Sequence, residues 1–354
     1  MGLTQTDRVE IQDVTGPSGA FDVIIDARSE HEFAVDHFPG ALNLPVVHDE
    51  EYALVGTLHK TDTHQAYLLG VQLSMANIST AISDTIQTFP RGTRVLVYCF
   101  RGGKRSKLWL DALTTIGFKV KRLQGGWKAY RAWVRGSLET LPLQFQYNVL
   151  CGPTGCGKTR LLYALRRSGS QILDLEDIAK HRGSLIGYLP GVNQPAQKLF
   201  DSLLLAELRQ LDPAKPVWVE AESKKIGDVA LPDSVFGAIH AGTVFRVEAP
   251  MEARVALWRE DYGHFEKDPF DMLSRLQHLR TLVGGEEFEK WKQLAAEERM
   301  PELFERLMTH HYDLAYGRSI RKHYPNYETT SVINMADLSE SALDKIAHAL
   351  LLPL

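Results

Sequence analysis

Cys99 is the residue of this chain best placed to do chemistry. It follows the apolar run 95–98 and precedes a turn with two glycines and a helix-like segment at 107–113. Backbone N–H groups at such a helix start attract anions, and neighbouring cations favour the thiolate form of cysteine. An ordinary buried cysteine is the alternative, but it needs neither glycines nor cations. The sequence predicts a nucleophilic thiol in an anion-binding loop, made with Phe100, Arg101, Gly102, Gly103, Lys104, Arg105 and Ser106.

A second anion-binding loop occupies residues 152–159. It follows a strand-like run at 145–150 and precedes a helix-like segment at 160–167, the setting in which the pattern G-x-x-x-x-G-K-T binds phosphate. We expect its N–H groups to wrap a diphosphate, Lys158 to add a positive charge and Thr159 to hold a magnesium ion. The residues of this loop are Gly152, Pro153, Thr154, Gly155, Cys156, Gly157, Lys158 and Thr159.

Two further segments offer partners for the second loop. A short run ends in Asp174, where a nucleotide kinase can keep a base or a metal partner, and a basic edge that includes Arg182 follows. Another apolar run, 216–219, ends in Glu220 and Glu222, like the acidic strand of a nucleotide triphosphatase. Because glutamate replaces the common aspartate there, nucleotide hydrolysis is less expected.

The C-terminal part, from 271 to 354, has a mainly helical pattern, with apolar residues three and four positions apart. Cations and aromatic residues gather between 306 and 324. Such a mixture can grip an RNA backbone and stack a base, but it also fits a solvated helix face with tyrosines packed on the core. The candidates for RNA binding are Arg318, Arg321, Lys322 and Tyr324.

The composition is that of a soluble globular protein with room for two domains. Of 354 residues, 44% are hydrophobic and 24% are charged, and the net charge of −4 gives no global attraction to nucleic acid. No apolar run reaches about 18 residues and no signal-peptide core is present at the N-terminus, so we expect a cytoplasmic protein. Three cysteines argue against a disulfide framework. Cys151 is expected in a strand core, and Cys156 as a small residue that fits its loop.

An alternation of strands and helices must position Cys99. The strand-like and helix-like segments are residues 21–26, 74–87, 94–98, 106–116, 119–123 and 128–134. This alternation predicts an α/β fold with an open parallel sheet and helices on both faces. Ligands bind at the carboxyl ends of the strands of such sheets, where Cys99 lies. Because Gly136 and Pro142 interrupt the helical pattern, we place a domain boundary at 137, with domains at 1–137 and 138–354.

Residues 47–67 show no clear periodicity, and their length favours a functional insertion near the active site. The run 48–51, His-Asp-Glu-Glu, could bind a metal, but a solvated charge cluster is commoner, and we predict no metal site. Asp26 is a weaker candidate for the site, because a carboxylate at a strand end is often a helix cap or an ion-pair partner. His37 is expected to be structural.

The N-terminal part resembles the rhodanese (sulfurtransferase) family over residues 10–137. The resemblance rests on Asp26-Ala-Arg, His37-Phe-Pro-Gly-Ala-Leu-Asn, the Cys99 loop and Leu123-Gln-Gly-Gly-Trp127. It implies that the cysteine carries a chalcogen as a persulfide or a related adduct. The loop is one residue longer than in many sulfur-transferring members and matches the family's phosphatase-like relatives. This length favours a phosphate-sized donor over thiosulfate.

Over nearly its whole length the chain resembles the bacterial tRNA 2-selenouridine synthase family. The features that carry this resemblance are the order of the two parts, both loops and the segment 174–184. The resemblance implies replacement of the sulfur of 2-thiouridine, at the wobble position of certain tRNAs, by selenium from selenophosphate. It also implies an S-geranyl-2-thiouridine intermediate made from geranyl diphosphate. Its implied partners are a tRNA anticodon stem-loop and an enzyme that supplies selenophosphate, and no membrane partner is expected.

Two other classes of function stay open at this point. An ATP-dependent thiouridylase would use the second loop to adenylate uridine and a Cys99 persulfide to deliver sulfur. A phosphatase-like or regulatory module would need only an anion pocket. Neither accounts as well for both loops together with the basic and aromatic C-terminal segment.

Overall fold

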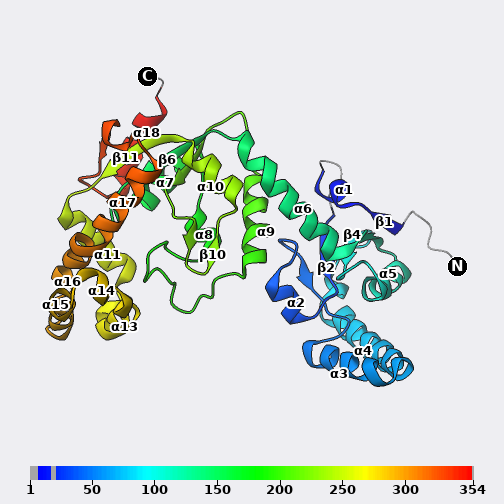
Figure 1. The fold of residues 1–354 in the computed structure, drawn as a ribbon. Coiled ribbons are helices and arrows are strands. Elements are labelled where there is room, and N and C mark those ends of the chain that lie inside the picture. Colours follow the sequence, from blue (N-terminus) through cyan, green and yellow to red (C-terminus); the bar gives the residue numbers. More distant parts are fainter. Residues whose placement is uncertain (1–6, 17–20, 353–354) are drawn as a thin grey trace. The chain divides into compact units, whose positions relative to one another are not determined.

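The computed structural model describes residues 7–16 and 21–352, which form two compact units (Figure 1). The first unit comprises Met1–Ser137 with Pro195–Ala206, and the second comprises Leu138–Gln194 with Glu207–Leu354. Each unit contains a parallel β-sheet with helices packed on it. The α/β class predicted from the alternating pattern is therefore confirmed.

The sheet of the first unit has the strand order β1-β5-β4-β2-β3, and neighbouring strands run parallel. The strands are β1 (Arg8–Val9), β2 (Val23–Asp26), β3 (Leu42–Asn43), β4 (Arg94–Tyr98) and β5 (Lys119–Leu123). The central strand β4 is buried from its second residue onward, as a run of apolar residues covered on both faces should be. Its carboxyl end leads directly into Cys99.

The helices of this unit include a packed pair, α3 and α4, of which the sequence predicted only the second half of α4. The helices in this part of the chain are α1 (Ile11–Thr15), α2 (Glu30–Val35), α3 (Asp49–Thr61), α4 (Thr63–Asp84), α5 (Lys104–Ile116) and α6 (Gly126–Thr140). Residues 47–67, which show no clear periodicity in the sequence, contain α3 and the start of α4, and these two helices pack together (Figure 1). Helix α3 buries none of its residues fully, so it lacks the apolar stripe that reveals a helix in sequence.

Helix α6 corrects the expected break at Gly136. The helix continues through this residue to Thr140, and Pro142 lies in the short turn Leu141–Gln144 that follows. Glycine inside a helix costs only about 1 kcal/mol relative to alanine, which the other contacts of the helix can offset. A helix pattern interrupted by one glycine is therefore a weak signal for the end of a helix. The domain boundary expected at 137 is a separate prediction, and the main segment of the first unit ends at Ser137.

The first unit also takes in a later segment, Pro195–Ala206, which contains most of α9 (Gln197–Leu208). Asp201 of this helix forms an ion pair with Arg131, and the Ser202 hydroxyl donates to the buried Asp36 carboxylate over 2.7 Å. Burial raises the pKa of Asp36, although hydrogen bonds from Ser202 and Trp127 oppose the shift. These contacts attach a segment far along the chain to the first sheet unit.

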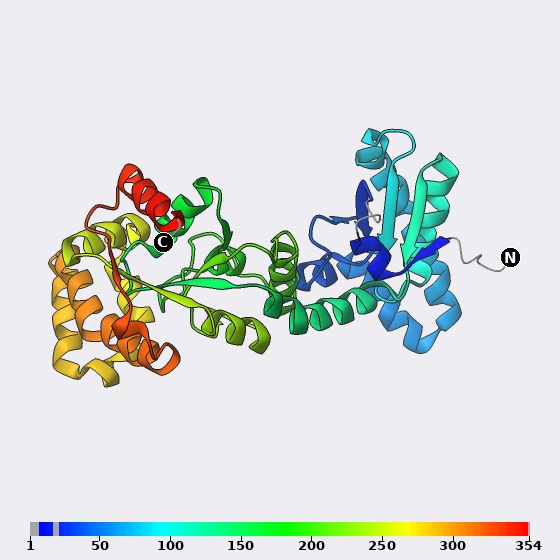
Figure 2. The same ribbon diagram turned by 90° about the horizontal axis from the view of Figure 1, so that it is seen from above.

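The second sheet has the order β12-β11-β6-β8-β7, again with parallel neighbours. Its strands are β6 (Tyr147–Cys151), β7 (Gln171–Leu173), β8 (Val217–Glu220), β11 (Thr243–Glu248) and β12 (Val332–Asn334), and an antiparallel hairpin joins β9 (Lys225–Ile226) to β10 (Val229–Ala230). Figure 2 shows α18 (Glu340–Leu351) beside α7 (Lys158–Arg167) on this sheet. The central strand β6 ends at the second anion-binding loop.

The C-terminal part is mainly helical, as the apolar spacing predicted. Further helices of the second unit are α8 (Leu175–Ala179), α10 (Asp233–His240), α11 (Met251–Tyr262), α12 (His264–Lys267), α13 (Pro269–Arg275), α14 (Arg280–Val283), α15 (Gly285–Ala296), α16 (Met300–Leu307) and α17 (Asp313–His323). A hydrophobic core that includes Trp258, Phe288, Trp291 and Phe304 holds the helices from α11 to α16 together. Within the described residues, no helix has the length and apolar character to cross a membrane.

Candidate functional site

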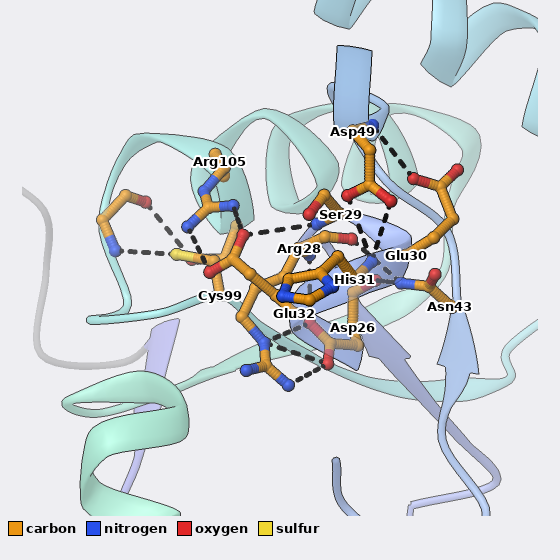
Figure 3. A network of polar contacts seen from close by, with 12 residues as sticks. Asp26, Arg28, Ser29, Glu30, His31, Glu32, Asn43, Asp49, Cys99 and Arg105 are labelled. Atoms are coloured by element: carbon orange, nitrogen blue, oxygen red, sulfur yellow. Dashed lines mark hydrogen bonds and ion pairs between the residues drawn. The ribbon is translucent and has the colours of Figure 1, made fainter. Parts of the chain in front are cut away.

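Cys99 lies between the end of β4 and the start of α5, with its sulfur facing the loop backbone (Figure 3). The Gly103 amide donates a hydrogen bond to Sγ over 3.2 Å, and the Ser106 Oγ lies 3.4 Å from the same sulfur. Cys99 is buried, with 3% of its surface exposed, but its sulfur faces these polar groups. The expected combination of a thiol with a helix N-terminus is thus present in the geometry.

The loop is fixed from behind by the first turn of α6. The Trp127 amide donates to the Cys99 carbonyl over 2.8 Å, and the Lys128 amide donates to the Phe100 carbonyl over 3.1 Å. A Cβ added to Gly126 would lie 2.1 Å from the Cys99 carbonyl oxygen, and Gly126 has φ of +62°. Only glycine allows the two backbone segments to come this close, which explains why a glycine directly precedes Trp127.

The three cations expected around the thiol have partners of their own. Arg105 forms an ion pair with Glu32 of α2 over 2.5 Å (Figure 3), the Lys104 ammonium lies 3.6 Å from the centre of the Tyr67 ring, and the Arg101 guanidinium lies near the Phe100 ring. Glu32 also completes the capping box of α2. An anion at Cys99 would therefore compete with Glu32 for Arg105.

Asp26 and His37 have structural roles. Asp26 is fully buried and forms an ion pair with Arg28 over 2.6 Å (Figure 3). His37 stacks on Phe33, and its Nδ1 makes a hydrogen bond of 2.8 Å with the Phe33 carbonyl. The ion-pair interpretation of Asp26 and the structural interpretation of His37 both agree with these contacts.

The charged run at 48–51 caps helices. His48 forms a hydrogen bond with Glu30, Asp49 accepts from the His31 amide over 3.1 Å, and Glu51 accepts from the His48 amide over 2.8 Å. Within the described residues, no group of three or more His, Cys, Asp or Glu side chains could hold a metal ion. The printed contacts of this run are hydrogen bonds that cap helices.

The second loop has the backbone that phosphate binding requires. Gly155 and Gly157 have φ of +78° and +86°, which glycine adopts without strain. A Cβ on Gly152 would lie 2.3 Å from the Val247 carbonyl oxygen. The Lys158 ammonium donates to the Gly152 carbonyl over 3.0 Å, at the first turn of α7. The loop thus presents a lysine and a helix N-terminus together.

Three glutamates surround Lys158, and one of them was missed in the sequence. Burial raises the pKa of Glu220, although Lys158 and a hydrogen bond with Thr159 oppose the shift. Burial and then the neighbouring Glu220 raise the pKa of Glu222 to about 8. Burial, and after it the nearby Glu220 and Glu222, raise the pKa of Glu176 well above its usual value. Burial alone would lower the pKa of Lys158. The neighbouring Cys156, Glu220, Glu222 and Glu176 outweigh burial, so the pKa of Lys158 is raised.

Asp174 and Arg182, the other candidate partners, are tied into local structure. Asp174 caps α8 by accepting from the Asp177 amide over 2.9 Å, and the Tyr163 hydroxyl donates to it over 2.5 Å. The Arg182 guanidinium donates to the Asp261 carbonyl and lies near the Tyr262 ring. Asp174 is close enough to the three glutamates to add to the upward shift of their pKa values.

The remaining cysteines are buried. Burial raises the pKa of Cys151 to about 12, and it also raises the pKa of Cys156, which has no exposed surface. The Cys156 sulfur would lie 2.7 Å from a Cβ on Gly152, so it fills the space under the loop. Both thiols belong to the core, as the sequence predicted.

Tyr324 requires a correction as a base-stacking residue. It is 4% exposed, and its ring stacks on His240 with 4.8 Å between ring centres. Because the core covers this ring, it cannot stack on a splayed base. Arg318, Arg321 and Lys322 lie on the exposed part of α17 and stay candidates for binding RNA.

Glu32, Glu176 and Arg122 are site neighbours that sequence reasoning missed. Glu32 carried a weak signal, because it stands three residues after Ser29 in a capping-box pattern. Glu176 stands two residues after Asp174 in an ordinary charged run, and Arg122 interrupts an otherwise strand-like run. Only contacts between distant segments show that these residues adjoin the two loops.

Two family models match the chain: a rhodanese-like domain over residues 11–132 and the tRNA 2-selenouridine synthase AAA domain over residues 145–334. A tRNA 2-selenouridine synthase of Hydrogenovibrio crunogenus is 32% identical over 327 residues, which covers 84% of this chain and 89% of that protein. That of Nitrosomonas europaea is 36% identical over 259 residues, or 72% and 67% of the two chains.

The chain belongs to the tRNA 2-selenouridine synthase family. The rhodanese-like match contains Cys99 and its loop, and the AAA domain match contains the second loop and all three glutamates. The membership implied by the sequence motifs is therefore confirmed. Each of the two matched regions therefore contains one of the two loops.

Gly126→Ala should disrupt the Cys99 loop. The added Cβ would clash with the backbone of Cys99 and Gly102, so we expect a loss of about 1–3 kcal/mol in the free energy of unfolding and roughly tenfold slower alkylation of Cys99. Urea denaturation and peptide-resolved iodoacetamide labelling measure the two effects. Gly136→Ala, in the same helix with nothing within 4 Å, is the control and should stabilise slightly. Equal behaviour of the two variants would contradict the close approach.

Glu222→Gln should change how stability depends on pH. The unfolded chain releases this proton near 4.5 and the folded protein near 8, so ionising Glu222 makes wild-type stability fall between these values as pH rises. The variant lacks this loss, and we expect its gain in melting temperature over wild type to be larger at about pH 9 than at about pH 5. Glu252→Gln, at an exposed position of α11, is the control. The same gain at both pH values would refute the assignment.

Proposed function

We propose that this protein converts 2-thiouridine at the tRNA wobble position to 2-selenouridine, with S-geranyl-2-thiouridine as the intermediate. The observation that carries the proposal is the presence of two separate anion-binding loops, one beside a thiol and the other beside a lysine, in a chain of this family. The loop beside the thiol would bind the phosphate of selenophosphate, and the loop beside the lysine would bind the diphosphate of geranyl diphosphate. The proposed enzyme is thus a selenotransferase and a geranyltransferase.

The second loop is assigned to geranyl transfer. A P-loop recognises phosphate oxygens, so it binds the diphosphate of a prenyl donor as readily as that of a nucleotide. Lys158 balances charge on the leaving diphosphate while the sulfur of 2-thiouridine forms a bond to carbon. Glu220 Oε1 is buried without a hydrogen-bond partner among the described residues, beside Thr159, and these two side chains would hold a Mg²⁺ ion that neutralises the diphosphate.

The Cys99 loop is assigned to selenium insertion. The loop would hold the phosphate of selenophosphate near the α5 N-terminus, while Cys99 directs the selenium. Selenium forms a bond to C2 of the nucleobase and the bond from C2 to sulfur breaks, so that geranylthiol leaves. Hydrolysis of the bond between selenium and phosphorus then releases phosphate. Alkylation matters because it converts the sulfur into a group that can depart as a thiol.

Two variants should separate the two steps. Cys99→Ala should accumulate geranylated tRNA without selenouridine, because only the second step needs the thiol. Lys158→Ala should slow geranylation at least roughly tenfold but still convert tRNA that is already geranylated, because the diphosphate contact is then not used. Mass spectrometry of nucleosides, after incubation with geranyl diphosphate and selenophosphate, measures both products.

Cys151→Ala is the thiol control for this experiment, and it should make selenouridine, because Cys151 lies in the core of β6 and outside both loops. Wild-type selenation by the Cys99→Ala variant would refute the role of Cys99. Unchanged geranylation by the Lys158→Ala variant would refute the diphosphate role. ATP-dependent sulfur incorporation into unmodified tRNA would instead favour a thiouridylase.

A further inference from the structure

Two arginines in the first unit are almost completely buried, but their surroundings differ. Arg28 and Arg122 are each 2% exposed. Arg28 pairs with the Asp26 carboxylate and also donates to the Asp36 carbonyl over 2.6 Å. Arg122 has no carboxylate partner among the described residues, and its Nε and Nη2 make no hydrogen bond there. A buried and unpaired guanidinium opposes folding, so its position calls for an explanation.

Among the described residues, the hydrogen bonds of the Arg122 guanidinium go to the Cys99 loop. Its Nη1 lies 3.4 Å from the carbonyl oxygen of Gly102 and 3.4 Å from that of Gly103, in geometry for donation to both. Arg122 is on β5, which pairs with β4, the strand that leads into Cys99. The positive charge of Arg122 therefore lies on the buried side of the loop, toward the sheet.

The first of these carbonyls belongs to the peptide group that contacts the sulfur. The Gly102 carbonyl and the Gly103 amide are the two ends of one peptide unit, and that amide donates to Cys99 Sγ over 3.2 Å. A cation at the carbonyl end polarises the unit and makes its N–H a stronger donor. Arg122 thus acts on the sulfur through one peptide group.

The second carbonyl is linked to the sulfur through Ser106. In the structure the Cys99 thiol donates to Ser106 Oγ over 3.4 Å, and the Ser106 hydroxyl donates to the Gly103 carbonyl over 3.2 Å. When Cys99 loses its proton, the hydroxyl can stabilise the thiolate only by turning away from this carbonyl. The Gly103 carbonyl then still accepts from Arg122 and from the Lys107 amide, which donates to it over 3.2 Å, so the hydroxyl can turn toward the sulfur without leaving a buried acceptor unpaired.

We infer that Arg122 is a positioning residue that stabilises the Cys99 thiolate through the Gly102–Gly103 peptide group and the Ser106 hydroxyl. The inference rests on the proposed role of Cys99 as the reactive thiol. The buried charge of Arg122 is then compensated by the thiolate or by an anion bound above the loop. Its effect is distinct from that of Arg105, a cation of the loop itself, because Arg105 is already paired with Glu32.

The test measures thiolate formation without any tRNA. Full-length wild type, Arg122→Met and Arg122→Lys are alkylated with iodoacetamide across a pH series, and the rate at Cys99 is followed by mass spectrometry. We expect Arg122→Met to react about tenfold more slowly near neutral pH, with the midpoint of its pH profile moved up by about one unit. Arg122→Lys should restore most of the rate, because it keeps the charge.

The control is Arg8→Met, because Arg8 faces Arg122 across the β1 and β5 pair but is exposed. Its profile should match that of wild type. An Arg122→Met profile with an unchanged midpoint would overturn the inference, even if its melting temperature fell, since that would be a packing effect. If Arg122→Met does not fold, Arg122→Gln gives the same comparison. These outcomes are independent of selenation, so a failure of the proposed function would be seen separately as a lack of selenouridine.

Discussion

The hydrogen bond from the Gly103 amide to the Cys99 sulfur is the contact on which the chemistry proposed for the first unit depends. It requires the chain to turn sharply between a buried strand and a helix, with its N–H groups directed inward. The turn holds because Gly102 and Gly126 let two backbone segments approach more closely than any side chain would allow. The amides of Trp127 and Lys128 hold the two segments together by donating to the Cys99 and Phe100 carbonyls.

The same principle operates in the second unit with different charges. There the loop glycines allow the backbone to curve around a phosphate position, and Lys158 stands at the helix start. Three glutamates surround this lysine, whereas the Cys99 loop is surrounded mainly by arginine and lysine. A cluster of carboxylates around one lysine suits the binding of an anion together with a metal cation. A cluster of cations around a thiol suits the binding of an anion without a metal cation.

The sequence failed where local pattern and tertiary packing disagree. Helix α3 was missed because none of its residues is fully buried, so it has no apolar stripe. The run of α6 through Gly136 was missed because the penalty for one glycine is small beside the packing of a long helix. Tyr324 was misassigned because sequence composition cannot tell an exposed aromatic ring from one stacked on His240 in the core.

The sequence by itself determined both loops, the strands that carry them, the α/β class and the family, because each is encoded by neighbouring residues whose spacing dictates the backbone. Tertiary structure alone decided which side chains meet those loops. Glu32 reaches Arg105, Glu176 joins Glu220, and Arg122 lies beneath Gly102, in each case across a large separation along the chain. Such contacts depend on how strands and helices pack, and no local pattern specifies them.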